Sequence, residues 1–288
     1  MARWSVSIDQ SIPVETRRFK LASGEIAAEV SGSPDAPLVI GIPGLSVNLR
    51  CFDVMYDALD PAKHRRLAFD PRGRGMSEKT PPGSYGWPSH VRDIIAMADE
   101  LGAEQFDLIG LSMGAWIAMK TAEMNPGRVR RLVLVDALGI PEEACIEPIY
   151  AGLDRLATVW PSKEAFLQLA ESFPQYRPWP VYKRLFEYEL EDVEGGAKAR
   201  SSREAALEDD KYRQEYFSYD LWKAVTMPTL VLRATEKLPP DYGFILTKDD
   251  YERFLREVPT ARGMEIEANH YTIAVTPEAA AAVAEFLA

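Results

Sequence analysis

One pentapeptide, Gly110-x-Ser112-x-Gly114, constrains the fold of this chain more than any other stretch. Residues 106–111 before it are short and mostly apolar, which predicts a buried strand, and residues 113–124 after it are rich in good helix formers. A serine on so tight a strand-to-helix turn has a strained backbone, which pushes its hydroxyl out at the carboxyl edge of the sheet. The context therefore predicts a nucleophilic Ser112. The alternative is an ordinary turn in which Ser112 caps the helix.

The rest of the chain has the rhythm of a parallel sheet. Residues 17–21 and 25–31 flank a Ser-Gly turn and predict an antiparallel hairpin. After it, buried strands alternate with amphipathic helices, and this alternation implies parallel strands joined by crossover helices. The later predicted strands are 38–42, 66–69, 106–111, 129–135, 227–232 and 264–267, and the predicted helices begin after Pro88, at Met113, near Thr247 and at Pro277.

The rhythm breaks between about Gly139 and Trp222. This stretch carries helical patterns and prolines, and it shows no convincing strand. We expect a helical insertion over the carboxyl edge of the sheet, whose aromatic side chains either line a substrate cavity or pack the insertion's own small core. These aromatics are Trp160, Phe166, Phe173, Tyr176, Trp179, Tyr182, Phe186 and Tyr188.

A serine hydroxyl is a poor nucleophile at neutral pH and needs a base within hydrogen-bond reach. The chain has three histidines. His64 lies on the amino side of a predicted strand, and His90 lies in the first turn of a predicted helix. His270 follows the last strand, so it lies at the carboxyl edge where Ser112 must also lie. We therefore expect His270 to be the base.

The composition argues against several classes of function. A formal net charge of −11 over 288 residues disfavours a nucleic-acid partner or an anionic membrane surface. No apolar run approaches the ~20 residues that span a bilayer, and residues 1–5 lead into polar sequence, so we expect a cytoplasmic protein without a signal peptide. Cys51 and Cys145 give no disulfide framework, and no Cys/His spacing typical of a metal site is present. We expect neither a metal nor a cofactor.

Together, the Gly-x-Ser-x-Gly turn, the strand order, the late histidine and the insertion resemble the α/β-hydrolase family over residues 17–288. The resemblance implies an α/β fold with a mostly parallel eight-stranded sheet, flanking helices and a helical cap after the sixth strand. Residues 1–138 and 223–288 are then the core domain, and residues 139–222 are the cap. Residues 70–77, Asp-x-Arg-Gly-x-Gly-x-Ser, are similar to a loop common in the family, and we expect a structural turn that braces the site.

The same resemblance implies two backbone N–H groups that would stabilise an oxyanion. One belongs to Met113, the residue after the nucleophile. The other belongs to the loop after the third strand, where Leu45 matches the donor position and Gly44 leaves room for a substrate carbonyl. Pro43 replaces the histidine that is usual in this loop, a departure that concerns the bracing of the loop rather than the donor.

The acid that would orient the base has three candidates. The family usually places it after the seventh strand, often as Gly-x-x-Asp, and no aspartate falls at that offset here. Asp241 lies a few residues later, at a family-like interval before His270. Asp136 follows the sixth strand, where a minority of members carry the acid, and Glu236 lies nearer the end of the seventh strand. We place Asp241 first, Asp136 close behind it and Glu236 third.

These features predict a serine hydrolase that cleaves a carboxylic ester or lactone of a small, partly apolar substrate through an acyl-enzyme on Ser112. One alternative is a carbon–carbon bond hydrolase of aromatic breakdown. For that reaction Arg177, Lys183 or Arg184 could bind a charged substrate, although such side chains more often lie on a solvated surface. The other alternative is a catalytically inactive binding protein on the same fold. The oligomeric state does not follow from the sequence.

Overall fold

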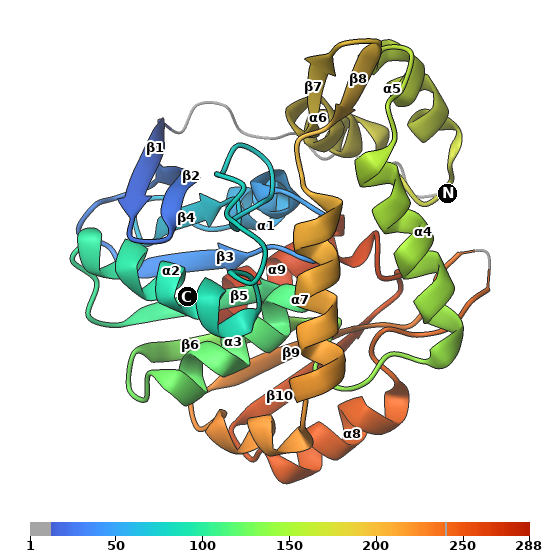
Figure 1. The fold of residues 1–288 in the computed structure, drawn as a ribbon. Helices are drawn as coiled ribbons and strands as arrows, with labels where there is room; N and C mark the ends of the chain where they lie inside the picture. The colour runs from blue at the N-terminus through green and yellow to red at the C-terminus, as the bar shows by residue number, and fades with distance from the viewer. Residues whose placement is uncertain (1–12, 240) are drawn as a thin grey trace.

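The protein is built around one eight-stranded sheet (Figure 1). The structure is a computed structural model that describes residues 13–239 and 241–288, so residues 1–5, the basis for expecting no signal peptide, lie outside the described part. The sheet order is β1-β2-β4-β3-β5-β6-β9-β10, with β1 antiparallel to β2, β2 antiparallel to β4 and the other neighbours parallel. The strands are β1 (Val14–Leu21), β2 (Gly24–Ser31), β3 (Leu38–Ile42), β4 (Arg65–Phe69), β5 (Phe106–Leu111), β6 (Val129–Val135), β9 (Thr229–Ala234) and β10 (Ala261–Ile266).

The central strands are buried on both faces, which is why they read as continuous apolar runs. In β3, Leu38, Ile40 and Ile42 join the apolar cluster on one face of the sheet, and Val39 joins the cluster on the other. Burial of each such side chain stabilises the fold by roughly 1.5–3 kcal/mol. The family resemblance therefore gave the correct fold class: an α/β fold with a mostly parallel sheet.

Helices cover both faces of this sheet. Side chains of α2, α3 and α8 contribute to one apolar cluster, and side chains of α1 and α9 contribute to the other. Thr247 and Thr276 cap α8 and α9 through their hydroxyl oxygens, as expected for helices that begin at these positions. The core helices are α1 (Asp53–Asp57), α2 (Trp87–Glu100), α3 (Met113–Met124), α8 (Lys248–Glu257) and α9 (Pro277–Leu287), with 3-10 turns η1 (Leu49–Phe52), η3 (Tyr219–Ala224) and η4 (Ile273–Val275).

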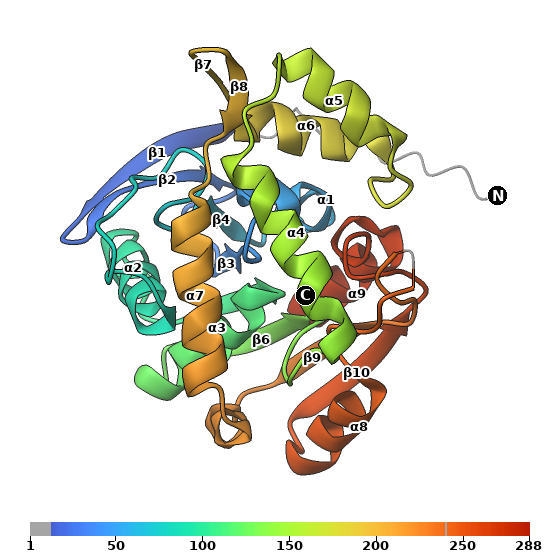
Figure 2. The ribbon, with the colours of Figure 1, turned by 45° about the vertical axis from the view of Figure 1, so that its right-hand side comes forward.

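Residues 139–222, called the insertion from here on, leave the sheet after β6 and return before β9. In Figures 1 and 2, α4 and α7 lie side by side over the carboxyl edge of the sheet, and α5, α6 and a small hairpin stand beyond them. The insertion contains η2 (Glu143–Cys145), α4 (Ile146–Ala157), α5 (Lys163–Ser172), α6 (Trp179–Glu189), β7 (Leu190–Val193), β8 (Gly196–Ala199) and α7 (Arg203–Tyr216).

The hairpin corrects the expectation that the insertion has no strand. β7 and β8 pair antiparallel across a turn in which Gly195 and Gly196 have φ values of 84° and 145°. L-residues with side chains rarely adopt such angles, so the two glycines determine the turn. The strands escaped prediction because each is four residues long and Val193 is the one β-branched residue in the pair.

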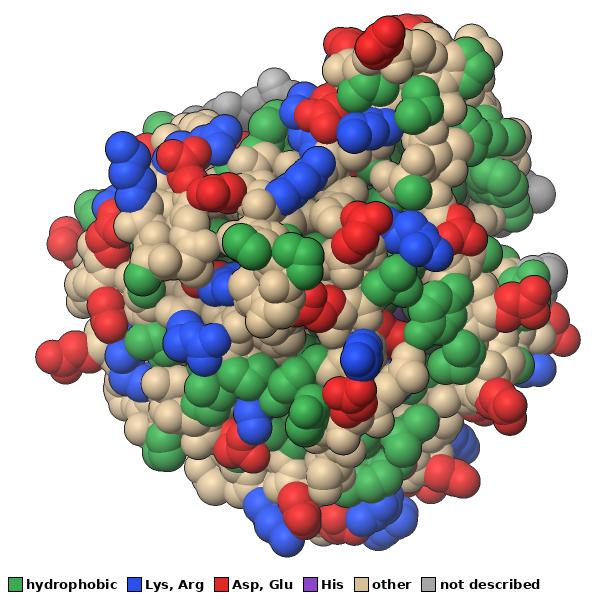
Figure 3. Space-filling view, in the orientation of Figure 1, with side chains coloured by type: hydrophobic (Ala, Val, Ile, Leu, Met, Phe, Trp, Pro, Cys, Tyr) green, Lys and Arg blue, Asp and Glu red, His purple; other side chains and the backbone are tan. Residues whose placement is uncertain are grey.

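The surface carries charges of both signs. On the face in Figure 3, acidic and basic side chains are interspersed, without a continuous field of one sign. Within the described residues, no helix is both long and apolar enough to cross a membrane.

Candidate active site

Ser112 lies between the last residue of β5 and the first residue of α3, with φ 55° and ψ −120°. This is a strained conformation for a residue with a side chain, and it is over-determined by packing. A Cβ on Gly110 would lie 2.3 Å from the carbonyl oxygen of Gly114, and a Cβ on Gly114 would lie 1.9 Å from that of Ile42. The two glycines are therefore required for the helix to pack this closely on the strands. The backbone N–H of Ser112 donates to the carbonyl of Val135 at 2.9 Å, which fixes the turn against β6.

The structure brings His270 to Ser112. Nε2 of His270 lies 3.0 Å from Oγ of Ser112, and Nδ1 of His270 lies 2.8 Å from Oδ2 of Asp136. His270 follows β10 in a tight turn, in which the side-chain oxygen of Asn269 accepts hydrogen bonds from the backbone N–H groups of Tyr271 and Thr272 at 2.9 and 3.2 Å. The result is an unbroken hydrogen-bonded chain from a hydroxyl through an imidazole to a carboxylate.

Asp136 is held in place by the neighbouring strand. Its backbone has a φ of 52°, its N–H donates to the carbonyl of Leu232 at 2.8 Å, and its Oδ1 accepts from the N–H of Ala234 at 2.8 Å. The side chain is buried, and burial raises the pKa of its carboxyl group, while the hydrogen bond from His270 opposes that rise. Oδ2 is thus committed to the imidazole and Oδ1 to the backbone.

The preference for Asp241 as the partner of His270 is corrected by this geometry. Asp241 is exposed and forms an ion pair with Lys237 at 2.9 Å. Glu236 is also exposed, and its backbone N–H donates to the carbonyl of Ala268. Both lie on the long connection after β9, and neither side chain bonds His270 in the described structure, whereas Asp136 directly follows β6, which pairs with β5.

The two expected oxyanion donors flank Ser112. Met113 is the first residue of α3, so its N–H has no acceptor within the helix. The N–H of Leu45 forms no hydrogen bond with any residue that the structure describes. A Cβ on Gly44 would lie 3.3 Å from Cβ of Ser112, which shows how closely this loop approaches the turn. The two amides could therefore stabilise negative charge on an oxygen bound beside Ser112.

The loop that carries Leu45 is braced by a buried ion pair that the sequence did not suggest. Nε of Arg74 donates to the carbonyl of Leu45 at 3.1 Å, and Nη2 of Arg74 donates to Asp209 of α7 at 2.6 Å. His90 lies 2.9 Å from the same carboxylate, and Gly86 donates its N–H to it. The interactions of Asp209 lower the pKa of its carboxyl group despite its burial. Asp209 lies more than a hundred positions from each partner in sequence, so no local spacing could have revealed the cluster.

The stretch 70–77 is a structural turn. The carboxylate of Asp70 accepts from the backbone N–H of Leu49 at 2.9 Å, from that of Met76 at 2.8 Å and from the hydroxyl of Tyr188 at 2.7 Å. A Cβ on Gly75 would lie 2.2 Å from this carboxylate, which explains the glycine. The turn thus ties the segment after the Leu45 loop to the insertion.

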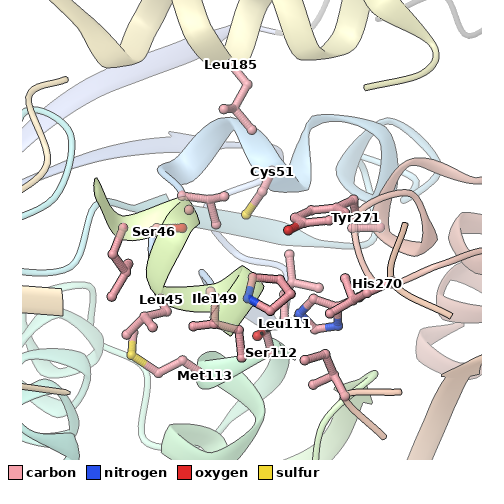
Figure 4. A pocket seen from close by; sticks show the side chains of 18 of the residues that line it. Leu45, Ser46, Cys51, Leu111, Ser112, Met113, Ile149, Leu185, His270 and Tyr271 are labelled. Atoms are coloured by element: carbon pink, nitrogen blue, oxygen red, sulfur yellow. Dashed lines mark hydrogen bonds between the residues drawn. The ribbon is translucent and has the colours of Figure 1, made fainter. Parts of the chain in front are cut away.

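A cavity of about 180 Å³ opens above Ser112. In Figure 4, Ser112, Met113 and His270 lie at its floor, and Leu185 lies on the opposite side. Tyr271 lies between the two, on the side of His270. Most of the lining is apolar, including Leu45, Val47, Ile149, Leu153, Val181 and Leu185.

The aromatic side chains of the insertion divide between the two expected roles. Tyr176, Tyr182 and Phe186 line the cavity. Phe166 does not line the cavity and packs edge-on against Phe186, in an apolar cluster that also contains side chains of the sheet. The three basic residues considered for a charged substrate do not line the cavity in the described structure: Arg177 donates to backbone carbonyls, Lys183 pairs with Glu187 and Arg184 pairs with Asp53.

In the part of the chain that the structure describes, neither the cysteine of the cavity nor a metal centre competes with Ser112. Cys51 lines the cavity, but burial raises the pKa of its thiol well above the usual value, so it stays protonated. No group of three or more His, Cys, Asp or Glu side chains is arranged to hold a metal ion there.

Comparison with known proteins agrees with this architecture. A 2-hydroxymuconate semialdehyde hydrolase of Pseudomonas putida is 35% identical over 113 residues, which are 39% of this chain and 38% of that protein. The match thus spans less than half the length of that curated relative. A 2-(acetamidomethylene)succinate hydrolase of Mesorhizobium japonicum is 24% identical over 257 residues, covering 88% of this chain and 89% of that protein.

The similarity extends to solved structures. The crystal structure of an E-2-(acetamidomethylene)succinate hydrolase superimposes with a TM-score of 0.82 at 22% identity, covering 96% of this chain and 99% of that one. At this identity the likeness shows the fold alone. A sequence profile of the alpha/beta hydrolase family matches residues 39–286, which is most of the chain. The chain therefore belongs to the alpha/beta hydrolase family.

Proposed function

We propose that the protein is a serine hydrolase that cleaves an ester or lactone of a small, partly apolar substrate. The observation that carries this proposal is the hydrogen-bonded chain from Ser112 through His270 to Asp136 at the floor of an apolar cavity. A serine, a histidine and a buried carboxylate in this order are the working parts of acyl transfer.

Each side chain has a definite role in the proposed reaction. Asp136 keeps the proton of the imidazole on Nδ1, so Nε2 of His270 is free to accept the proton of Ser112 as its Oγ attacks the substrate carbonyl. The N–H groups of Leu45 and Met113 stabilise the oxyanion. His270 then protonates the leaving group and activates a water molecule, which releases the acid from Ser112.

We also propose that the insertion acts as a cap domain over the core formed by residues 1–138 and 223–288. Its side chains Ile149, Leu153 and Leu185 line the cavity that faces Ser112. A substrate bound below them is shielded from bulk water, which strengthens the electrostatic contribution of the oxyanion donors.

Carbon–carbon bond hydrolysis is the second candidate, because one relative is named a 2-hydroxymuconate semialdehyde hydrolase. That relative is 35% identical to this chain in an alignment that covers 39% of this chain. Turnover of 2-hydroxymuconate semialdehyde without turnover of any ester or lactone would favour this candidate over the first.

Intact mass after incubation with an alkyl fluorophosphonate tests the proposed nucleophile. We expect one adduct on the wild-type protein and none on Ser112→Ala, together with ester hydrolysis that is lost in the variant. An unmodified wild-type protein that hydrolyses no member of a panel of short esters and lactones would contradict the proposal and favour an inactive binding protein.

A further inference from the structure

The cavity wall contains one cation without an acidic partner among residues 13–239 and 241–288. Five charged side chains line the cavity, and they differ in how their charge is balanced. Four of them have a partner of opposite charge: Arg50 pairs with Glu29, Arg213 pairs with Asp210 at 2.8 Å, and Asp209 pairs with Arg74 at 2.6 Å. The fifth is Arg155, and no carboxylate of the described chain forms an ion pair with it.

Arg155 lies on α4, and its guanidinium is only partly bonded. Nη2 donates to the carbonyl of Ser46 at 3.3 Å, and the guanidinium carbon lies 5.7 Å from the ring centre of Phe186. Nη1 is shielded from solvent and has no hydrogen-bond partner among the described residues. A charged group whose donors are only partly satisfied by the protein is costly to bury, and this one lines the cavity.

Arg155 lies near two residues that are adjacent in sequence to residues of the proposed active site. Ser46, which it contacts, follows the oxyanion donor Leu45, and Tyr271, whose hydroxyl it influences electrostatically, follows His270. Burial raises the pKa of Tyr271 to about 12, so its hydroxyl remains a donor at neutral pH. In Figure 4 that hydroxyl points into the cavity. A positive charge and a hydroxyl donor thus face the space above Ser112.

We propose that the guanidinium of Arg155 binds a carboxylate on the substrate, so that the substrate is an ester or lactone with a free carboxylate elsewhere in the molecule. A planar guanidinium matches a carboxylate through two parallel hydrogen bonds, and an apolar surrounding strengthens them. Tyr271 is the second donor to the same group. The inference rests on the proposed hydrolysis at Ser112, and it goes further by naming the class of substrate.

The competing explanation is that Arg155 only braces the Leu45 loop through its hydrogen bond to Ser46. The two explanations differ in what they predict for neutral substrates. A bracing residue affects the hydrolysis of every ester equally, whereas a carboxylate-binding residue affects only charged ones.

The kinetic test compares matched pairs of esters. Mono-para-nitrophenyl esters of butanedioic, pentanedioic and hexanedioic acid carry a free carboxylate, and the corresponding neutral esters replace it with an isopropyl group. For at least one chain length we expect wild-type kcat/KM to be higher for the charged member, after subtraction of the uncatalysed rate. In Arg155→Met this value falls about 10- to 100-fold, while that for the neutral ester changes less than about threefold.

Two further variants calibrate this result. Arg155→Lys keeps the charge but not the planar pair of donors, so its loss for charged esters is expected to lie between those of wild type and Arg155→Met. Arg203→Met is the matched control, because Arg203 pairs with Asp154 next to Arg155 in sequence and does not line the cavity. It removes the same charge, and both substrate classes are expected to react as in wild type. Equal losses for charged and neutral esters in Arg155→Met would overturn the proposal.

A binding measurement separates this proposal from the proposed reaction. Isothermal titration of the Ser112→Ala variant with 5-phenylpentanoate and 5-phenylpentanamide requires no turnover. We expect the carboxylate to bind more tightly than the amide, and this preference to disappear in Ser112→Ala/Arg155→Met. If Ser112 resists the fluorophosphonate but the preference is present and depends on Arg155, the carboxylate site stands and the hydrolase proposal fails. If Ser112 is labelled and the preference is absent, the reverse holds.

Discussion

The floor and the roof of the cavity are built in different ways. The floor contains Ser112 and His270, and the buried Asp136 is hydrogen-bonded to His270. The three residues follow three strands of the sheet and are fixed by hydrogen bonds and by two backbones with positive φ. The roof consists of side chains of α4 and α6, which pack through aromatic and aliphatic groups in separate apolar clusters. In the proposed reaction the fixed polar atoms of the floor carry out the bond-breaking step, and the larger apolar surface of the roof determines which substrates bind.

The sharpest test of the floor is Asp136→Asn. An amide cannot hold the imidazole in the same protonation state, so we expect kcat for ester hydrolysis to fall by about 10³- to 10⁴-fold. Asp241→Asn and Glu236→Gln are matched controls at exposed positions and are expected to keep activity within about twofold. Steady-state kinetics, with circular dichroism as a check of folding, would measure this. A larger loss in either control than in Asp136→Asn would remove Asp136 from the proposed mechanism.

The second prediction concerns Asp209, a residue of the insertion that supports a loop of the core. Asp209 belongs to the insertion, yet through Arg74 it supports the loop of Leu45. In Asp209→Asn the buried guanidinium loses its counter-charge, which is expected to lower the free energy of unfolding by about 3–5 kcal/mol. We also expect about a tenfold loss in kcat with KM nearly unchanged, because the oxyanion donor is displaced.

Urea unfolding and steady-state kinetics of Asp209→Asn test both expectations, and Arg74→Met/Asp209→Leu is the informative companion. This double variant removes both charges and is expected to recover much of the lost stability without recovering kcat. If kcat in both variants equals that of wild type, Arg74 does not position Leu45.

The roof is tested by Ile149→Ala on α4, because this apolar side chain lines the cavity. Shortening this side chain enlarges the cavity and removes apolar contact. We expect KM for short neutral esters to rise by roughly three- to tenfold, with kcat within about twofold. Measurement over a series of acyl lengths would show the optimum moving to longer chains. A loss confined to kcat would mean that the roof also takes part in the chemistry.

The last prediction concerns activity-independent stability where core and insertion meet, at Asp70 and Tyr188. Burial raises the pKa of Asp70 to about 7 in the folded protein, above the ~3.9 of an unfolded chain. The folded state therefore keeps a proton that the unfolded state has released, and stability falls as pH rises from about 4 to about 7, by at most about 1.4 kcal/mol per pH unit. Asp70→Asn carries no such proton, so urea unfolding at several pH values is expected to show a shallower fall. An identical slope in the variant would exclude Asp70 as the source.

Most of the fold could be predicted from the sequence, because its signals are local. Strands β3, β5 and β6 have the predicted bounds, since continuous apolar runs between turn residues leave few alternatives. The helix starts at Thr247 and Thr276 depend on equally local signals, because each threonine caps the helix that follows it. The hairpin of β7 and β8 was missed because its strands are too short for a periodic pattern.

The site was less predictable, because its partners are distant in sequence. The order of strands placed His270 near Ser112, but three acids were compatible with that order, and the choice depends on where Asp136 points after its unusual backbone turn. Arg155 shows no distinctive spacing on a helix that also carries Asp154 and Glu147. Only the folded arrangement shows that Arg155 lines the cavity and that no carboxylate of the described residues pairs with it.

The pairing of Arg74 with Asp209 has a consequence for how relatives of this protein can diverge. In a chimera that takes residues 139–222 from another chain, Arg74 would be buried without a counter-charge unless the donor segment also supplies an acid at the position of Asp209. New substrate ranges are therefore more accessible by exchanging α4 to α6 and retaining α7 as part of the recipient. In this respect α7 belongs with the core in an exchange of segments, and the boundary for recombination lies inside the insertion.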